Sequence, residues 1–109
     1  MKQFCLALDL KNDPALIDRY EAEHRQVWPE VIDSIQKSGI NLMQIYRTGN
    51  RLFMIILADD DFSFEKKAAM DAANPVVQEW ERLMDIFQQR LPWAAPEEKW
   101  VLMDLIFEA

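Results

Sequence analysis

The fold is decided by residues 40–58, which read INLMQIYRTGNRLFMIILA. Residues 40–47 and residues 51–58 both have the character of strands, and the second run is strongly apolar. Between them, Thr48-Gly49-Asn50 is typical of a turn, because Gly49 is free to adopt a positive φ. This stretch therefore predicts a β-hairpin.

A further strand is expected at each end of the chain. Residues 3–11 alternate in polarity and place four apolar side chains on one side: Phe4, Leu6, Leu8 and Leu10. Residues 99–107 form the last predicted strand, which is largely apolar on both faces. One face carries Trp100, Leu102, Asp104 and Ile106, and the other carries Val101, Met103, Leu105 and Phe107.

Helices are expected between the first strand and the hairpin. Asp13 can cap a helix that begins at Pro14 and runs to about Val27, because proline suits the first helical position. Pro29 disfavours helical geometry at Trp28, so a break or kink is expected there. A second helical stretch, residues 30–37, ends at Ser38-Gly39.

Helices are also expected after the hairpin. The loop Asp59-Asp60-Asp61 can cap a helix that begins near Phe62. Asn74-Pro75 repeats the Asp13-Pro14 pattern and starts a helix that runs to about Gln89. Its apolar positions follow the helical period: Val76, Val77, Trp80, Leu83, Met84 and Phe87.

The order of these elements is β-α-β-β-α-β, which predicts a ferredoxin-like α+β fold with an antiparallel sheet and helices on one face. We expect residues 1–109 to form a single domain. Because the last strand and the hairpin are apolar on both faces, the open face of the sheet would leave a large exposed apolar patch. We therefore expect a homodimer, a dimeric α+β barrel; the alternative is that this face lines a ligand pocket.

Composition argues against several classes of partner. The net charge is −7, from 12 basic and 19 acidic residues, and the basic residues are scattered, so nucleic acid and anionic membranes are not expected. We recognise no signal peptide and no apolar run long enough to span a bilayer. The single cysteine, Cys5, fits a reducing cytoplasm and is interpreted as an ordinary buried strand residue.

His24 is the leading candidate for chemistry, because it is the only histidine in the chain. Histidine is the side chain whose ordinary pKa lies nearest neutrality, which suits it to donate and accept protons. If residues 20–28 are helical, Tyr20, His24 and Trp28 share one face, which could stack on a sugar ring and move a proton. The structural alternative is a hydrogen-bonded histidine near a helix end.

No sequence motif indicates a cofactor or metal. There is no glycine-rich phosphate loop, no nucleophile elbow and no Cys/His cluster with the spacing of a metal site. Chemistry without a metal or a cofactor is therefore the simplest interpretation for an enzyme.

The sequence resembles the L-rhamnose mutarotase family, small dimeric α+β-barrel enzymes that interconvert sugar anomers. The most specific match is Tyr20-x-x-x-His24-x-x-Val27-Trp28-Pro29-Glu30, and the resemblance covers nearly the whole chain. It continues through Gly39, Ile45-Tyr46, Asn50-Arg51-Leu52-Phe53 and Val77-Gln78-x-Trp80. The resemblance implies a cofactor-independent isomerase acting on a monosaccharide.

The resemblance also implies roles for individual residues. His24 matches the catalytic proton donor, and Tyr20 and Trp80 match sugar-contacting positions. Two positions depart from the pattern: Met43 stands where rhamnose-acting members have a tyrosine, and Glu81 where they have a second tryptophan. We expect the substrate to be a 6-deoxyhexose such as L-fucose or L-rhamnose, and we favour L-fucose because these changes alter the sugar contacts. Met43, Glu81 and Trp28 are further candidates for substrate binding.

Mutarotation requires the anomeric hydroxyl to lose a proton while the ring oxygen gains one. We expect His24 to donate to the ring oxygen, whereas the complementary base is left open between a carboxylate, Tyr20, Tyr46 and bound water. Met43 and Tyr46 lie three residues apart on a strand and so should face opposite sides, and we favour Met43 for the pocket. The rival functions are a heme-binding protein or monooxygenase of the same barrel class, a cofactor-independent monooxygenase, and a non-catalytic sugar-binding module.

Overall fold

The computed structural model describes residues 1–109 and has the predicted α+β order of elements. The first half contains strand β1, helices α1 and α2, and the hairpin of strands β2 and β3: Lys2–Leu10, Pro14–His24, Pro29–Lys37, Ile40–Thr48 and Arg51–Ala58. The second half contains helices α3 and α4 and two short strands, β4 and β5: Phe64–Ala72, Pro75–Asp85, Gln88–Gln89 and Val101–Leu102. No helix is both long and apolar enough to cross a bilayer.

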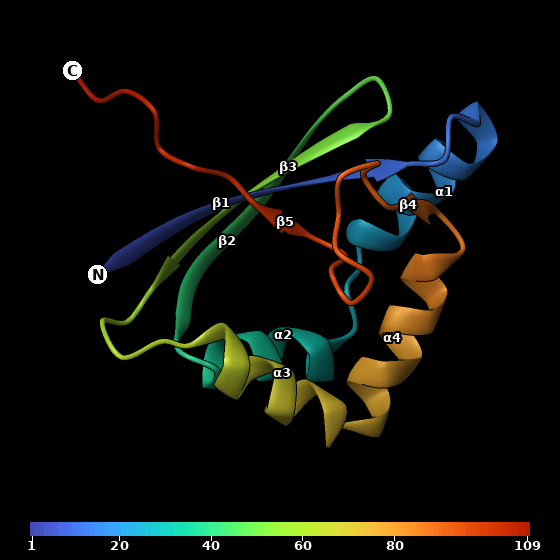
Figure 1. Cartoon of the computed structure of the whole chain (residues 1–109). Helices are drawn as coiled ribbons and strands as arrows, with labels where there is room; N and C mark the ends of the chain where they lie inside the picture. Colours follow the sequence, from blue (N-terminus) through green and yellow to red (C-terminus); the bar gives the residue numbers. More distant parts are fainter.

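The sheet is antiparallel, with strand order β2-β3-β1-β4, and β5 also pairs with β1. Strands β4 and β5 thus lie on one side of β1, and the β2–β3 hairpin lies on the other. This is the ferredoxin-like arrangement that the sequence predicted. Figure 1 shows the helices on one side of the sheet and the red C-terminal segment leading away from it.

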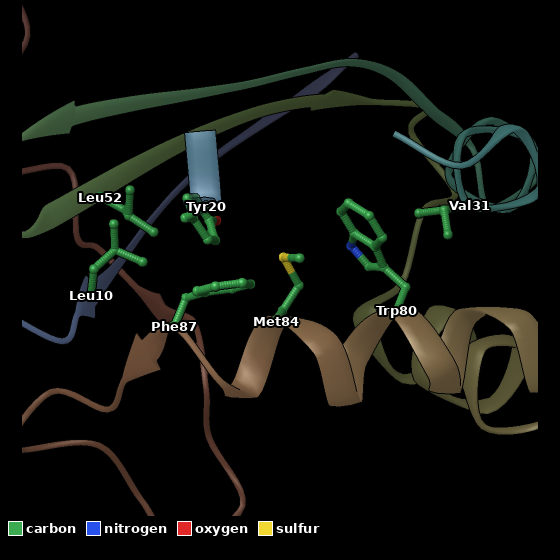
Figure 2. Packing of buried hydrophobic residues seen from close by; sticks show 7 residues of the cluster. All are labelled: Leu10, Tyr20, Val31, Leu52, Trp80, Met84 and Phe87. Carbon is green, nitrogen blue, oxygen red and sulfur yellow. The ribbon is translucent and has the colours of Figure 1, made fainter. Parts of the chain in front are cut away.

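Alternation along the strands creates two different faces. The side chains that face the helices include Leu6, Leu8, Leu52, Met54 and Ile56, all buried. Helix α4 packs its apolar stripe beneath them, so that Trp80, Met84 and the following Phe87 meet Leu10, Leu52 and Tyr20 in one cluster (Figure 2). Burying such side chains contributes about 1.5–3 kcal/mol each to folding.

The opposite face of the sheet is not covered by any helix of the chain (Figure 1). On it, Leu42 and Tyr46 are exposed, and Phe53, Ile55 and Leu57 are only half-buried. The segment after β5 is more exposed still, with 94% of Ile106 and 78% of Phe107 accessible. The chain therefore exposes apolar side chains both on the open face of the sheet and along the segment after β5.

The helix starts follow the expected capping residues at two of the four helices. The Asp13 carboxylate accepts hydrogen bonds from the Ala15 and Leu16 amides, and Asn74 does the same for Val76 and Val77. At α3 the expectation was wrong, because Ser63 caps that helix and not the aspartate loop, so the helix begins at Phe64. Phe62 is instead buried beside the sheet.

Two helices end earlier than the sequence predicted. Helix α1 stops at His24 and not at about Val27, and Trp28 becomes the residue that precedes the Pro29 start of α2. Helix α4 stops at Asp85 and not at about Gln89, because Gln88 and Gln89 leave the helix and pair with Leu10 and Asp9 of β1.

The last strand is much shorter than predicted. Only Val101 and Leu102 pair with β1, and the Met103 amide adds one hydrogen bond to the Cys5 carbonyl at 2.8 Å. Residues 104–107 carry the apolar pattern of a strand but lie away from the sheet (Figure 1). A strand forms only where a partner edge supplies hydrogen bonds, and a pattern of side chains does not reveal that partner.

Candidate active site

A cavity of about 340 Å³ lies between the helices and the sheet. Of the 22 residues that line it, 15 are hydrophobic, so the few polar side chains stand out against apolar walls. This combination of apolar lining and convergent polar groups is typical of a small-molecule site. The two ends of the cavity differ in chemistry.

His24 lines this cavity from the last residue of α1. Its Nδ1 lies 2.8 Å from the Tyr20 backbone oxygen, which can only accept, so Nδ1 carries the proton and donates it. This bond fixes the tautomer, and it leaves Nε2 as the ring nitrogen that can reach a ligand. His24 is half-buried and not sealed in the core.

Aromatic rings surround the imidazole. The centroid of the Tyr20 ring lies 4.3 Å from that of His24, with the two planes tilted by 37°, and the Trp80 ring meets His24 edge-on at 5.5 Å. Trp28 packs edge-on against Trp80 at 5.2 Å but does not itself line the cavity. The structure therefore brings Tyr20, His24 and Trp80 to the cavity and places Trp28 behind them.

Tyr20 is almost fully buried, with 3% of its surface accessible. Burial raises its pKa to about 12; hydrogen bonding by Gln88 opposes this shift, and the nearby negative charge of Glu81 adds to it. The hydroxyl is therefore a neutral phenol throughout the neutral pH range, able to donate a hydrogen bond but unsuited to act as a base.

Glu81 is held at the same end of the cavity by an ion pair. Its Oε2 lies 2.8 Å from Lys99 Nζ, and the same ammonium lies 2.7 Å from Asp85 Oδ1. Burial would lower the pKa of Lys99, but its hydrogen bonds and attraction to the two carboxylates outweigh that effect and raise it. Lys99 thus stays charged and fixes one Glu81 oxygen, leaving Oε1 for a ligand.

Met43 lines the cavity from β2, where it is opposite Ile56 in the register. Tyr46 is opposite Phe53 and is 54% exposed on the other face of the sheet. The expectation that these two residues face opposite sides is confirmed, and Tyr46 cannot reach the cavity from its position.

A second polar group lines the other end of the cavity. Lys67 pairs with Asp71 at 2.5 Å, and the Ser34 hydroxyl donates to Asp71 at 3.4 Å. All three residues line the cavity, and they come from α2 and α3. These side chains bond to one another, and the positive charge of Lys67 balances the negative charge of Asp71.

Sequence reasoning missed several of these lining residues. Lys99 and Gln88 belong to the His24 end, and Ser34, Lys67 and Asp71 belong to the other end. Gln88 was expected at the end of a helix and Lys99 at the start of a strand, so nothing in either local pattern indicated the cavity. Lys67 and Asp71 are four residues apart, a spacing that predicts an ion pair on a helix but not its location.

No group of three or more histidine, cysteine or acidic side chains is arranged to hold a metal ion.

Comparison with known proteins shows the family of this chain. The family model described as L-rhamnose mutarotase matches residues 3–109. An L-fucose mutarotase of Xanthomonas campestris is 48% identical over 102 residues, covering 92% of this chain and 82% of that protein. An L-rhamnose mutarotase of Paraburkholderia phytofirmans is 24% identical over 83 residues, covering 74% of this chain and 75% of that protein.

The fold is shared with a solved structure at low sequence identity. The L-rhamnose mutarotase FA22100 of Formosa agariphila superposes with a TM-score of 0.73 and 20% identity, covering 100% of this chain and 99% of that one. Because the family model matches residues 3–109 and a curated relative is 48% identical, the chain belongs to the L-rhamnose mutarotase family.

Proposed function

We propose that this protein is a sugar mutarotase that interconverts the α and β anomers of a 6-deoxyhexose, with L-fucose as its preferred substrate. The observation that carries this proposal is the position of the single histidine. Its Nδ1 is held by the Tyr20 carbonyl at 2.8 Å, and its imidazole lines an apolar cavity. A pyranose with one methyl group suits a site of apolar walls and few polar groups.

His24 supplies the acid in this proposal. Protonated His24 gives its Nε2 proton to the ring oxygen as the bond between the anomeric carbon and that oxygen breaks. A base takes the proton of the anomeric hydroxyl, so that an open-chain aldehyde forms. Rotation about the bond to the aldehyde carbon followed by the reverse transfers closes the ring as the other anomer and restores both groups.

Glu81 is the base that the geometry favours among the alternatives. Tyr20 is a neutral phenol because its pKa is raised to about 12, and Tyr46 lies on the exposed face of the sheet. The Glu81 charge is close enough to act on the Tyr20 hydroxyl, and the Tyr20 ring lies against His24 with their centroids 4.3 Å apart. The acid and the carboxylate therefore belong to one end of the cavity.

Two arguments support the preference for L-fucose. Met43 and Glu81 both line the cavity, and the resemblance implies a tyrosine and a tryptophan at these two positions in rhamnose-acting members. The relative with 48% identity is named an L-fucose mutarotase, whereas the L-rhamnose mutarotase described above is 24% identical.

The test is anomer exchange measured by NMR on L-fucose and L-rhamnose side by side. We expect faster exchange of L-fucose, and we expect His24→Ala to lower the rate about 10²–10⁴-fold, the usual contribution of a general acid or base. Arg25→Ala, a change at the next, exposed residue, is the matched control and should keep wild-type exchange. A sugar that binds without faster exchange would identify a non-catalytic binding module instead.

We also propose that the protein is a cytoplasmic homodimer built on the open face of the sheet. The exposed apolar side chains of β2 and of the segment after β5 support this, since soluble monomers rarely expose such a surface: Leu42, Tyr46, Leu105, Ile106 and Phe107. Light scattering after gel filtration should give twice the mass of the 109-residue chain, and deletion of residues 103–109 should shift it toward the monomer. An unchanged mass after deletion would remove the segment from the interface.

A further inference from the structure

Gln88 has a side-chain atom that the protein itself does not satisfy. Among all buried side-chain nitrogen and oxygen atoms of the chain, Gln88 Oε1 is the one without a hydrogen-bond partner. A buried polar atom left unpaired is costly, and such atoms are rare in folded proteins. An unpaired acceptor in a binding cavity is therefore evidence for a ligand group that completes it.

The position of Gln88 connects this atom to the proposed sugar site. Gln88 lines the same cavity as Tyr20, His24 and Glu81. It is held there by β4, opposite Leu10 in the register, and its neighbour Phe87 is fully buried. The backbone at Gln88 is thus fixed by the sheet and the core, which is a requirement for a residue that discriminates between ligands.

The chemistry of the amide restricts what can complete it. An amide oxygen accepts hydrogen bonds and never donates, so its partner must carry an N–H or an O–H. Within a monosaccharide the donors are the hydroxyl groups, whereas the ring oxygen and the methyl group of a 6-deoxyhexose offer none. The amide nitrogen is the part of Gln88 that can donate to the Tyr20 hydroxyl beside it.

We propose that the Gln88 side-chain oxygen accepts a hydrogen bond from one of the hydroxyls at positions 2, 3 and 4 of the bound sugar, and that Gln88 thereby contributes to which sugars the site selects. This inference rests on the proposed function, because it takes a sugar as the occupant of the cavity. Gln88 then binds both the substrate and the Tyr20 hydroxyl, whereas His24 and Glu81 transfer the protons.

The test compares L-fucose with three analogues, each of which has one ring hydroxyl, at position 2, 3 or 4, replaced by hydrogen. Wild-type protein and the Gln88→Leu variant are measured by anomer-exchange NMR, with the uncatalysed exchange of each sugar subtracted. In the wild type, one analogue should have a kcat/KM about tenfold below that of L-fucose through the loss of this hydrogen bond. In Gln88→Leu that single penalty should disappear, while the penalties of the other two analogues persist.

The matched control is Gln89→Leu, the same chemical change at the next residue, which is exposed. It should reproduce every wild-type ratio. Gln88→Asn, which keeps the amide but withdraws it by one methylene, should lose the same penalty and provides a second variant if the leucine protein does not fold.

Two outcomes would overturn the inference. One is that Gln88→Leu lowers the rates of all four sugars by the same factor. That result would indicate that Gln88 only holds Tyr20 in place, or that a bound water and not the sugar donates to its oxygen. The other is that the variant changes nothing.

Failure of the proposed function has a different signature. If the wild type accelerates none of the sugars, the same comparison is made on dissociation constants measured by calorimetry. If one analogue binds more weakly than L-fucose to the wild type but not to Gln88→Leu, the role of Gln88 in binding is supported even though the protein is not a catalyst. Absence of any binding by the wild type would reject both the sugar site and its acceptor.

Discussion

Removal of the Tyr20 hydroxyl should change how the stability of the protein depends on pH. The pKa of Tyr20 is raised from 10.0 to about 12, chiefly by burial, so the folded state holds the phenolic proton more tightly than the unfolded state does. Stability is unaffected by this group below about pH 10, where both states are protonated. As the pH rises from about 10 to about 12, the unfolded chain ionises first, and stability is lost.

The magnitude follows from the two pKa values. A pKa difference from 10.0 to about 12 corresponds to about 3 kcal/mol when the titration is complete. At about pH 11.5 roughly 2 kcal/mol of this is already lost relative to about pH 9. For a protein whose free energy of unfolding is commonly about 5–15 kcal/mol, this is a measurable share.

The assay is urea unfolding at a series of pH values for the wild type, Tyr20→Phe and Tyr46→Phe. Other groups titrate in all three proteins, so the informative quantity is the difference between their pH profiles. Tyr20→Phe should lack about 2 kcal/mol of the alkaline loss that the wild type shows at about pH 11.5. Tyr46→Phe retains Tyr20, so its profile should follow the wild type.

Parallel profiles for the wild type and Tyr20→Phe would refute this reasoning. They would mean that the Tyr20 hydroxyl reaches solvent in the folded state, in contrast to its 3% exposure. The argument that Tyr20 remains a neutral phenol, and is therefore not the base of the reaction, would then fail.

Three further changes test the parts that position the site. Lys99→Met should lower the free energy of unfolding in urea by about 1–2 kcal/mol and lower the exchange rate several-fold, since it removes the partner of Glu81. The control is Arg82→Met, which removes an exposed ion pair with Glu79 and should cost less than about 0.5 kcal/mol. Asn74→Ala should cost about 1 kcal/mol, because two amides of α4 lose their acceptor, and an unchanged unfolding midpoint would refute the capping role. Met43→Tyr, which introduces the hydroxyl that the resemblance implies for rhamnose-acting members, should shift the ratio of exchange rates toward L-rhamnose.

The sequence indicated much of the architecture because the decisive interactions are local. The hairpin required Gly49, which adopts a φ of 55°, and two helix starts required Asp13 and Asn74 beside a proline. The opposite orientations of Met43 and Tyr46 follow from the alternation of any regular strand. His24 could be singled out because it is the one histidine, and its tautomer follows from an atom four residues away.

Pattern alone gave no means of predicting where elements end. The period of α4 continues through Phe87, yet the helix stops at Asp85 because β1 offers an edge to which Gln88 and Gln89 bond. The apolar alternation after Leu102 likewise does not make a strand, because pairing with β1 ends at Leu102 and only the Met103 amide bonds to β1 beyond it. Sequence alone does not report the competition between helical and sheet hydrogen bonds.

The amino-acid sequence by itself determined the order of elements, most of their caps and turns, and which imidazole we propose as the proton donor, since each depends on neighbours within a few residues. Only the tertiary structure decided which distant side chains join it: Lys99 reaches Glu81 across 18 positions, and β4 brings Gln88 to Tyr20. The reason is physical, because these contacts are between side chains that the helices and strands bring together only when they pack on one core.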